Sequence, residues 1–125
     1  MTDYKALTKD ISDHLVQLHK TQSGVMKGFS EMGKAAMAES ALDPKMKELI
    51  ALAIGVASRC DGCIGFHTRA LGRLGATTRE VHDALGVAIY MGGGPAAMYA
   101  ANAVGAFDEV LAAQSQSKTL SATVG

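Results

Sequence analysis

The sequence predicts an all-α fold, a single domain of about six helices over residues 1–125. Apolar residues recur at three- and four-residue steps along most of the chain, which is the spacing of one helix face. Helix start and stop signals punctuate this pattern, and no stretch alternates as a half-buried strand does. With 125 residues, the chain is long enough for one core and too short for two ordinary domains.

The first two helices are predicted by two apolar stripes near the N-terminus. The first helix is expected to begin behind Thr2 or Asp3, either of which can cap its free amides. Its stripe consists of Tyr4, Leu7, Ile11, Leu15 and Leu18. The pattern resets around Gly24, and the second stripe consists of Val25, Phe29, Met32, Ala36 and Met37. Both segments are therefore predicted to be amphipathic helices.

The third and fourth helices are predicted to lie at the centre of the domain. Asp43-Pro44 supplies an N-cap and a proline at the first helical position. The helix that follows contains "LIALAIGVA" and is apolar almost all round, so we expect protein to surround it. The stretch "CIGFHTRALGRLG" then predicts a fourth helix, which starts at the cysteine motif and ends at Gly75, a residue suited to a left-handed C-cap.

The fifth and sixth helices are separated by a glycine run. Thr77 and Glu80 have the spacing of a capping box and predict the start of the fifth helix. Its expected inward side chains are Val81, Leu85, Ala88 and Ile89. The glycines before Pro95 must break this helix, and an alanine-rich sixth helix is expected from about Pro95 to Ala113. Residues 114–125 are small, polar and aperiodic, which predicts a flexible tail.

Composition argues against several classes of partner. Twelve basic and twelve acidic residues balance, so the chain offers no net positive charge to a nucleic acid. The longest apolar run, residues 49–57, is far shorter than the roughly 20 residues that span a bilayer. We therefore expect a cytoplasmic protein that binds neither nucleic acid nor membrane. Its 14 glycines and few aromatic residues predict a thin, closely packed core, which homo-oligomerisation is expected to supplement.

The stretch "ASRCDGCIGFHTRA" contains two cysteines and a histidine, Cys60, Cys63 and His67. These residues offer three metal ligands, whereas a structural zinc site takes four, and no second pair of cysteines or histidines follows. A structural disulfide is also disfavoured, because cytosolic thiols are kept reduced and so short a loop constrains little chain entropy. The simplest alternative is two buried cysteines that act as small apolar residues.

Redox chemistry is the interpretation that this spacing favours. At a helix start, the free amides and the helix dipole favour the thiolate form of first-turn thiols. His67 lies four residues after Cys63 on the same helical face, so its imidazole can reach the Cys63 sulfur. It can accept the thiol proton and later return a proton to a leaving group. Cys63 is therefore the expected nucleophile.

Glu48 is a further candidate, within an otherwise apolar helix. It is either a first-turn acid that complements the helix dipole or a carboxylate that orients His67. In a straight hairpin, Glu48 lies about 18 Å before Cys60 and His67 about 10 Å after it, a mismatch of about 7 Å. A long side chain, a crossing angle or one water could close this gap, so both interpretations stay open. His82, by contrast, is interpreted as a partly buried structural histidine.

Together these residues have the spacing E-x11-C-x2-C-x3-H, which resembles the AhpD-like (alkylhydroperoxidase-like) branch of the carboxymuconolactone decarboxylase family. The resemblance runs from about Ala35 to Phe107 and includes "KMKELIALAIGVASRCDGCIGFHTRALGRLG". It implies a helical domain that assembles as homotrimers or homohexamers. It also implies a thiol-dependent peroxidase or disulfide-exchange centre.

The resemblance further implies a role for each residue of the motif. Cys63 would be the peroxidatic cysteine, oxidised to a sulfenic acid, and Cys60 the resolving cysteine and proton donor. His67 would be the base, and Glu48 its partner in a proton relay. No bound cofactor or metal is implied. The substrate would be a peroxide, and an external dithiol, either a reductant protein or dihydrolipoamide with its lipoyl group, would restore the cysteine pair.

The chain departs from the family pattern at one position. Some peroxidase members have a histidine directly before the second cysteine, where this chain has Gly62, so a second base is missing. Two alternative functions remain. One is the lyase activity of the decarboxylases that give the family its name, which lack the cysteine pair. The other is a non-catalytic thiol protein that responds to redox state or metal.

Overall fold

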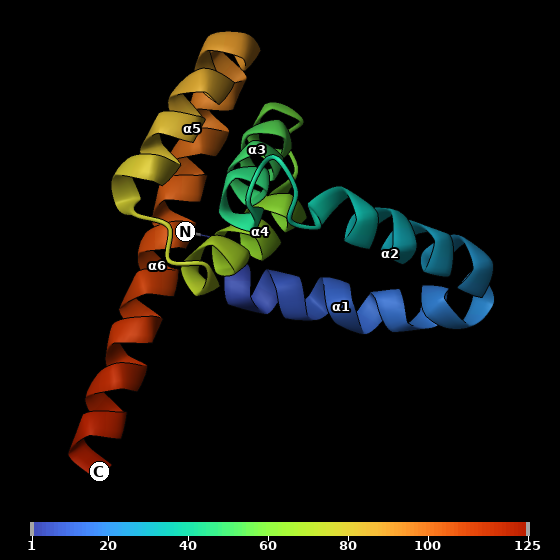
Figure 1. The fold of residues 1–125 in the computed structure, drawn as a ribbon, viewed down its shortest axis with the longest axis horizontal. Helices are drawn as coiled ribbons and strands as arrows, with labels where there is room; N and C mark the ends of the chain where they lie inside the picture. Colours follow the sequence, from blue (N-terminus) through green and yellow to red (C-terminus); the bar gives the residue numbers. More distant parts are fainter. Residues whose placement is uncertain (1, 125) are drawn as a thin grey trace.

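The computed structural model describes residues 2–124, and their side chains as far as residue 120. This part of the chain contains six helices and no strand, which confirms the all-helical prediction. The helices, labelled in Figure 1, are α1 (Tyr4–Thr21), α2 (Ser23–Met37), α3 (Pro44–Ala57), α4 (Asp61–Arg73), α5 (Thr78–Gly92) and α6 (Gly94–Val124).

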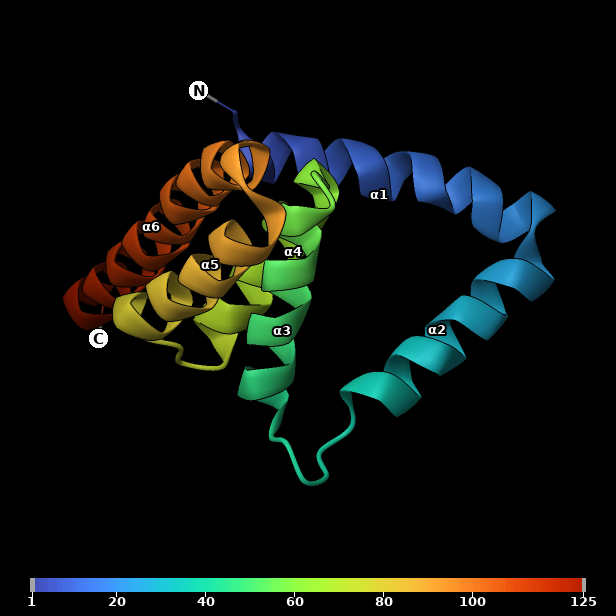
Figure 2. The same cartoon turned by 90° about the horizontal axis from the view of Figure 1, so that it is seen from above.

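The last four helices form a packed bundle, and the first two form a hairpin that leaves it. α3 packs against α4, α5 and α6, and α6 packs against α4 and α5. α1 lies against α4, whereas α2 contacts α1 and the bundle only lightly and has no buried residue. Figure 2 shows the turn between α1 and α2 as the part of the hairpin farthest from the bundle. The apolar stripe of α2 is therefore left uncovered, with Val25, Phe29 and Met32 each more than half exposed.

The predicted helix starts are confirmed by their capping hydrogen bonds. The Asp3 carboxylate accepts from the Ala6 amide at 3.0 Å, and the Asp43 carboxylate accepts from the Met46 amide at 2.8 Å. At α5, the Thr77 hydroxyl accepts from the Glu80 amide at 3.0 Å and the Glu80 carboxylate accepts from the Thr77 amide at 2.9 Å. These contacts satisfy amides that have no partner within the helix.

Two lysines at the start of α3 connect it to its neighbours. Lys47 Nζ donates to the carbonyls of Ala36 and Ala38 at 2.9 and 2.5 Å, which places a cation at the C-terminal end of α2. Lys45 Nζ lies 2.8 Å from the Glu80 carboxylate at the start of α5. This contact lowers the pKa of Glu80, and the Thr77 amide lowers it further. The two lysines thus link the start of α3 to the C-terminal end of α2 and to the N-terminal end of α5.

The core consists of aliphatic side chains set against small ones. Leu52, Val56, Ile64 and Leu71 of α3 and α4 are fully buried. Facing them, α6 buries a run of small residues and one aromatic, Ala96, Ala100, Ala103, Ala106 and Phe107. Full burial of a large aliphatic side chain contributes about 1.5–3 kcal/mol, and alanines let the helix axes approach closely enough to achieve it. The predicted thin, closely packed core is present.

Two expectations about burial are wrong, those for Ile89 and His82. The expectation that protein surrounds α3 stays a prediction, because Ile54 is 61% exposed and Met46 and Ile50 are also exposed in the single chain. Ile89 of α5 is 39% exposed rather than inward, whereas Val81, Leu85 and Ala88 are buried. His82 is exposed and is not a partly buried structural residue. An apolar helix requires an apolar environment, but the sequence does not say whether its own chain provides it.

The glycine run breaks the chain where predicted, but α6 is longer than expected. α5 ends at Gly92, and Gly93 follows with a φ of 76°. α6 then continues through residues 114–120 to Val124, where the sequence predicts a flexible tail. The segment is helical because it extends an existing helix and needs no new nucleus. Residue 125 and the side chains of residues 121–124 lie outside the described part of the chain, and the predicted flexibility stays a prediction.

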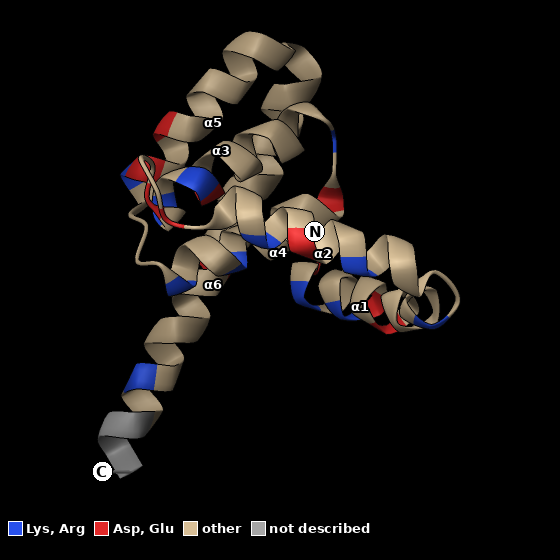
Figure 3. Ribbon diagram, turned by 45° about the vertical axis from the view of Figure 1, so that its right-hand side comes forward, with Lys and Arg blue, Asp and Glu red and all other residues tan. Residues whose placement is uncertain are grey.

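Among the described residues, no helix is both long and apolar enough to cross a membrane. Figure 3 shows acidic and basic residues on the same helices. On α1, for example, Lys9 pairs with Asp13 at 2.7 Å.

Candidate functional site

The cysteine motif lies where α3 turns back into α4, and Gly55 sets how closely these helices approach. A Cβ atom on Gly55 would lie 2.6 Å from the Cβ atom of Cys63 and 3.7 Å from its sulfur. Carbon atoms do not approach to 2.6 Å without displacing one another. Glycine at position 55 therefore allows Cys63 to lie directly on the backbone of α3.

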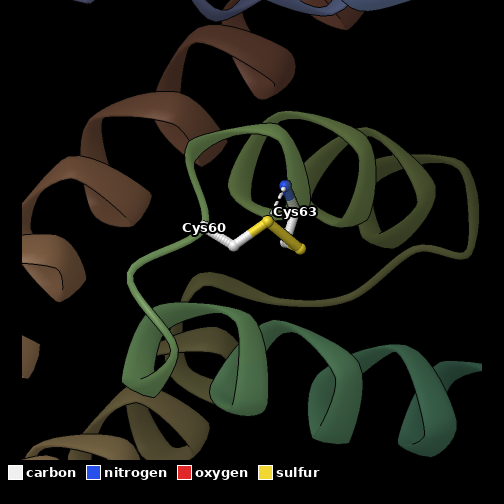
Figure 4. Close-up of a disulfide and its surroundings, with 2 residues drawn as sticks. All are labelled: Cys60 and Cys63. Atoms are coloured by element: carbon white, nitrogen blue, oxygen red, sulfur yellow. Dashed lines mark hydrogen bonds between the residues drawn. A yellow bond between two sulfur atoms is a disulfide. The ribbon is translucent and has the colours of Figure 1, made fainter. Parts of the chain in front are cut away.

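The two cysteines are joined in a disulfide, and Cys60 is also the N-cap of α4. Their Cα atoms are 5.2 Å apart, within the ordinary range for a bridge. The Cys63 amide donates to the Cys60 sulfur at 3.1 Å, as the dashed line in Figure 4 shows. Both residues are half-buried. A disulfide, which the sequence disfavours as a permanent structural bridge, is thus present in the structure.

The carboxylate of Glu48 and the imidazole of His67 form a direct contact. Glu48 Oε2 lies 2.6 Å from His67 Nδ1, and the side chains are 15% and 30% exposed. An ionised carboxylate only accepts hydrogen bonds, so Nδ1 carries the hydrogen in this contact. Among the described residues, His67 Nε2 has no hydrogen-bond partner, and its lone pair is available to accept a proton.

This contact decides the question that the sequence left open for Glu48, and the approach of Cys63 to Gly55 explains how the gap is closed. The estimate from sequence measured both residues from Cys60, although the helices first touch at Gly55 and Cys63. From that point, Glu48 is seven residues back on α3, about 10 Å, and His67 is four residues along α4, about 6 Å. The remaining mismatch of about 4 Å is within reach of the two side chains.

The predicted approach of His67 to the Cys63 sulfur is not realised as a hydrogen bond in the described part of the chain. With both sulfurs in the disulfide, Cys63 has no thiol hydrogen to donate. His67 nevertheless follows Cys63 by one turn on the same face of α4. The structure thus joins Cys60 to Cys63 and His67 to Glu48, with Cys63 and His67 one turn apart on α4.

The opposite side of α4 is covered by α1. A Cβ atom on Gly62 would lie 3.0 Å from the Ile11 side chain, and one on Gly65 would collide with Thr8. Burial, followed by the negative charge of Asp61, raises the pKa of Tyr4. The first helix therefore packs directly against the cysteine motif, and Gly62 leaves room for Ile11.

A groove of about 1240 Å³ lies between α1, α4 and α6, but it is not the cysteine site. Its lining includes Gly65, Thr68, Arg69 and Arg73 of α4, which face away from Cys63 and His67. None of the four predicted site residues lines it.

Within the described residues, no three histidine, cysteine or acidic side chains are grouped so that they could hold a metal ion. Cys60 and Cys63 bond to each other, and His67 bonds to Glu48. A pair of cysteines can take up two electrons when its disulfide is reduced, and an imidazole can carry a proton, so the arrangement is suited to these two steps.

Two residues of this site were missed by sequence reasoning. Gly55 is one of many glycines, and only its distance from Cys63 gives it a role. Arg59, directly before Cys60, has a φ of 58°, in the left-handed region that L-residues rarely adopt. No sequence signal identifies it, because glycine or asparagine is the usual residue in that conformation.

Comparisons with known proteins place this arrangement in a family. The sequence profile described as the carboxymuconolactone decarboxylase family matches residues 23–106. An uncharacterized protein of Cupriavidus necator is 39% identical over 107 residues, covering 86% of this chain and 95% of the relative. The uncharacterized protein 4 in the cox locus of Paracoccus denitrificans is 35% identical over 82 residues, covering 66% of this chain and 74% of the relative.

A solved structure is also similar. It is the crystal structure of an apo protein of the carboxymuconolactone decarboxylase family from Legionella pneumophila, with a TM-score of 0.84 and 50% identity. The match covers 86% of this chain and 96% of the other. The profile match begins at residue 23 rather than at Ala35, so α2 belongs to the matched region.

We predict that Gly55→Ala displaces Cys63 from α3. The added methyl group has no room beside the Cys63 Cβ atom, so the variant should lose about 1–3 kcal/mol of unfolding free energy. Gly86→Ala is the matched control, because position 86 is also helical and has nothing within 4 Å. It should gain about 0.5–1 kcal/mol. Urea unfolding of the oxidised proteins measures both. Equal stability of Gly55→Ala and wild type would contradict the proposed close contact.

Proposed function

Because the chain belongs to the carboxymuconolactone decarboxylase family, we propose that it is a thiol-dependent peroxidase of the AhpD-like branch. Its Cys60–Cys63 pair reduces a peroxide and is restored by an external dithiol. This proposal goes beyond family membership, since the family includes both peroxidases and decarboxylases.

The observation that carries the proposal is the 2.6 Å contact between Glu48 and His67, a histidine that follows Cys63 by one turn of α4. A carboxylate on Nδ1 fixes the orientation and tautomer of an imidazole and leaves Nε2 to exchange protons. A purely structural disulfide needs no oriented base one turn away. The contact therefore supports a site at which a proton and an electron pair move together.

In the first step, the Cys63 thiolate attacks the terminal oxygen of a hydroperoxide, ROOH. An S–O bond forms, the O–O bond breaks, and RO⁻ takes the proton held by His67 to leave as the alcohol. Cys63 is oxidised to a sulfenic acid and the peroxide is reduced. Nε2 of His67 holds the proton that the thiol gave up, and Glu48 stabilises the imidazolium during this interval.

In the second step, Cys60 attacks the Cys63 sulfur and hydroxide leaves with a proton as water, which forms the disulfide seen in Figure 4. A dithiol then attacks Cys63, and Cys60 leaves as a thiolate. The hydrogen bond from the Cys63 amide to the Cys60 sulfur favours this leaving group. Completion of the exchange releases the oxidised dithiol, for which the proposed reductant is a lipoyl group or a dithiol protein of the cytoplasm.

Two features bear on the strength and type of activity. Position 62, where some peroxidase members have a histidine, is a glycine covered by Ile11, so His67 is the base that this site offers. A decarboxylase-type lyase needs no cysteine pair, and replacement of either cysteine would not affect it. The cysteine variants described below therefore separate these functions.

We also propose that copies of the chain cover the apolar face of α2, in a homotrimer or homohexamer. Val25, Phe29 and Met32 form this face and are between 61% and 66% exposed. Ile54 of α3 is exposed to the same degree. Burial of such side chains contributes favourable free energy that a lone chain forgoes, which favours association.

We predict that Cys63→Ser abolishes dithiol-dependent peroxide consumption, because it removes the sulfur that is oxidised. Cys60→Ser should stop turnover but leave a sulfenic acid on Cys63 that a dimedone probe traps and mass spectrometry detects. Both variants keep the size and shape of the side chain. If Cys63→Ser consumes peroxide as fast as the wild type, or if the trapped sulfenic acid lies on Cys60, the assignment of roles is wrong.

We predict that Glu48→Gln lowers the kcat/KM for peroxide by about 10- to 100-fold, because a neutral amide stabilises an imidazolium poorly. Glu48→Asp, which retains the carboxylate, should recover part of the loss, whereas a merely structural role would not distinguish charge. Glu39→Gln is the control, since Glu39 is exposed in the segment between α2 and α3. Stopped-flow peroxide consumption measures these rates. Unchanged kcat/KM in Glu48→Gln would refute the relay.

We predict that light scattering after size exclusion gives the wild type a mass of three or six times the 12.9 kDa chain. Phe29→Ser combined with Val25→Ser should shift the protein towards the single-chain mass, because the proposed contact loses its apolar side chains. The paired substitution Ser12→Ala with Ser30→Ala serves as a control for double replacement at exposed helical positions. A wild type of single-chain mass would contradict the proposal.

A further inference from the structure

α3 and α4 end with the same backbone motif, and only one of them uses the residue that suits it. At the end of α4, the Ala76 amide donates to the Leu71 carbonyl at 3.0 Å and the Gly75 amide donates to the Gly72 carbonyl at 3.3 Å. This is the Schellman pattern, and Gly75 adopts the required left-handed conformation with a φ of 74°.

At the end of α3, the same two bonds place an arginine in the left-handed position. The Cys60 amide donates to the Gly55 carbonyl at 2.9 Å, and the Arg59 amide donates to the Val56 carbonyl at 3.1 Å. Arg59 has a φ of 58°. A residue with a Cβ atom is strained there and glycine is not, so the chain retains an unfavourable residue where glycine fits. Strained residues of this kind concentrate at functional sites.

The position and the charge of Arg59 indicate a function for this strained residue. Arg59 is exposed and precedes Cys60, whose backbone amide is fixed by the motif itself. Among the described residues, it forms no ion pair with any carboxylate. The charged residue inside the motif is acidic, Asp61, and it is also exposed. Arg59 is therefore an exposed cation without an ion pair, directly before Cys60 in the chain.

We propose that Arg59 recognises an anionic group on the dithiol that reduces the Cys60–Cys63 disulfide, so that among the reductants proposed above a dithiol with a nearby carboxylate is favoured over neutral dihydrolipoamide. The inference rests on the proposed function, since it concerns the reductant of that same pair. The guanidinium attracts a carboxylate carried by the dithiol and holds it while one thiolate attacks Cys63. An S–S bond forms between dithiol and Cys63, the Cys60–Cys63 bond breaks, and Cys60 leaves as a thiolate. The second thiol of the reductant then completes the exchange, so two electrons pass from dithiol to protein.

Dihydrolipoate and dihydrolipoamide provide the test, because they have the same dithiol and differ in a carboxylate against a neutral amide. The oxidised protein is mixed with excess of either compound, and alkylation followed by mass spectrometry measures the rate of disulfide reduction. The variants are Arg59→Gln, which removes the charge, and Arg59→Lys, which keeps it. Arg79→Gln is the control for the loss of one positive charge, since Arg79 is an exposed residue of α5.

For the wild type at low salt, we expect reduction by dihydrolipoate to be about two- to fivefold faster than by dihydrolipoamide, the range that an exposed ion pair supports. Arg59→Lys and Arg79→Gln should keep this preference. Arg59→Gln should lose it by slowing dihydrolipoate alone. Salt at about 0.5 M should also reduce the preference in the wild type, because it screens exposed charges.

The variant Arg59→Gly relieves the strain, and its melting temperature provides a second readout. Glycine adopts the left-handed conformation freely, so this variant should melt about 3–6 °C above the wild type. It should also lose the preference for dihydrolipoate, which shows that the loss does not come from unfolding. A variant that is not more stable, or that keeps the preference, overturns the inference.

The remaining outcomes are distinguishable. If Arg59→Gln slows both dithiols equally, the residue acts on the cysteines rather than on the reductant, and the inference is wrong while the proposed function stands. The same holds if the wild type reacts equally with both compounds. If neither dithiol reduces the wild-type disulfide, the proposed function itself fails, and the inference fails with it.

Discussion

The approach of Cys63 to the backbone of α3 at Gly55 is the contact on which the site depends. It sets where the α3–α4 hairpin begins to pair, and therefore which residues lie opposite each other further along it. With the helices touching at this point, the carboxylate of Glu48 reaches the imidazole of His67. A wider hairpin would keep the same sequence motif but separate the acid from the base. Gly55 thus affects the contact made by Glu48, which lies about two helical turns away on α3.

The remainder of the bundle keeps this hairpin rigid from the other sides. α6 packs closely against α4, where a Cβ atom on Gly72 of α4 would collide with Val110 of α6. α1 covers Gly62 and Gly65 with Ile11 and Thr8, and the Thr8 hydroxyl accepts from Arg69 at 2.6 Å. The result is a disulfide that is half-buried against closely packed helices. Such packing limits the movement available to the two cysteines.

This architecture explains why the chain leaves so much apolar surface uncovered. A bundle of small side chains achieves close packing with little buried area per residue. The α1–α2 hairpin adds α2, none of whose residues is fully buried. The apolar faces of α2 and α3 are thus available to other copies of the chain. Arg59, with its left-handed backbone conformation and no ion pair among the described residues, is a second feature that is unfavourable for an isolated chain.

The sequence by itself determined the helices, their starts and the identity of the motif, because these depend on local physics. Asp3, Asp43 and the Thr77–Glu80 pair cap helices through residues three positions away, and a 3.6-residue period is visible in any stripe. It also indicated Cys63 and His67 as neighbours on one face. Tertiary structure alone decided the contact of Glu48 with His67, the exposure of Ile54, Ile89 and His82, and the roles of Gly55 and Arg59. Most of these features depend on how far apart two helices pack and on which sides they turn towards each other. The role of Arg59 depends on a backbone conformation that arginine rarely adopts. The spacing of residues in the sequence reveals neither.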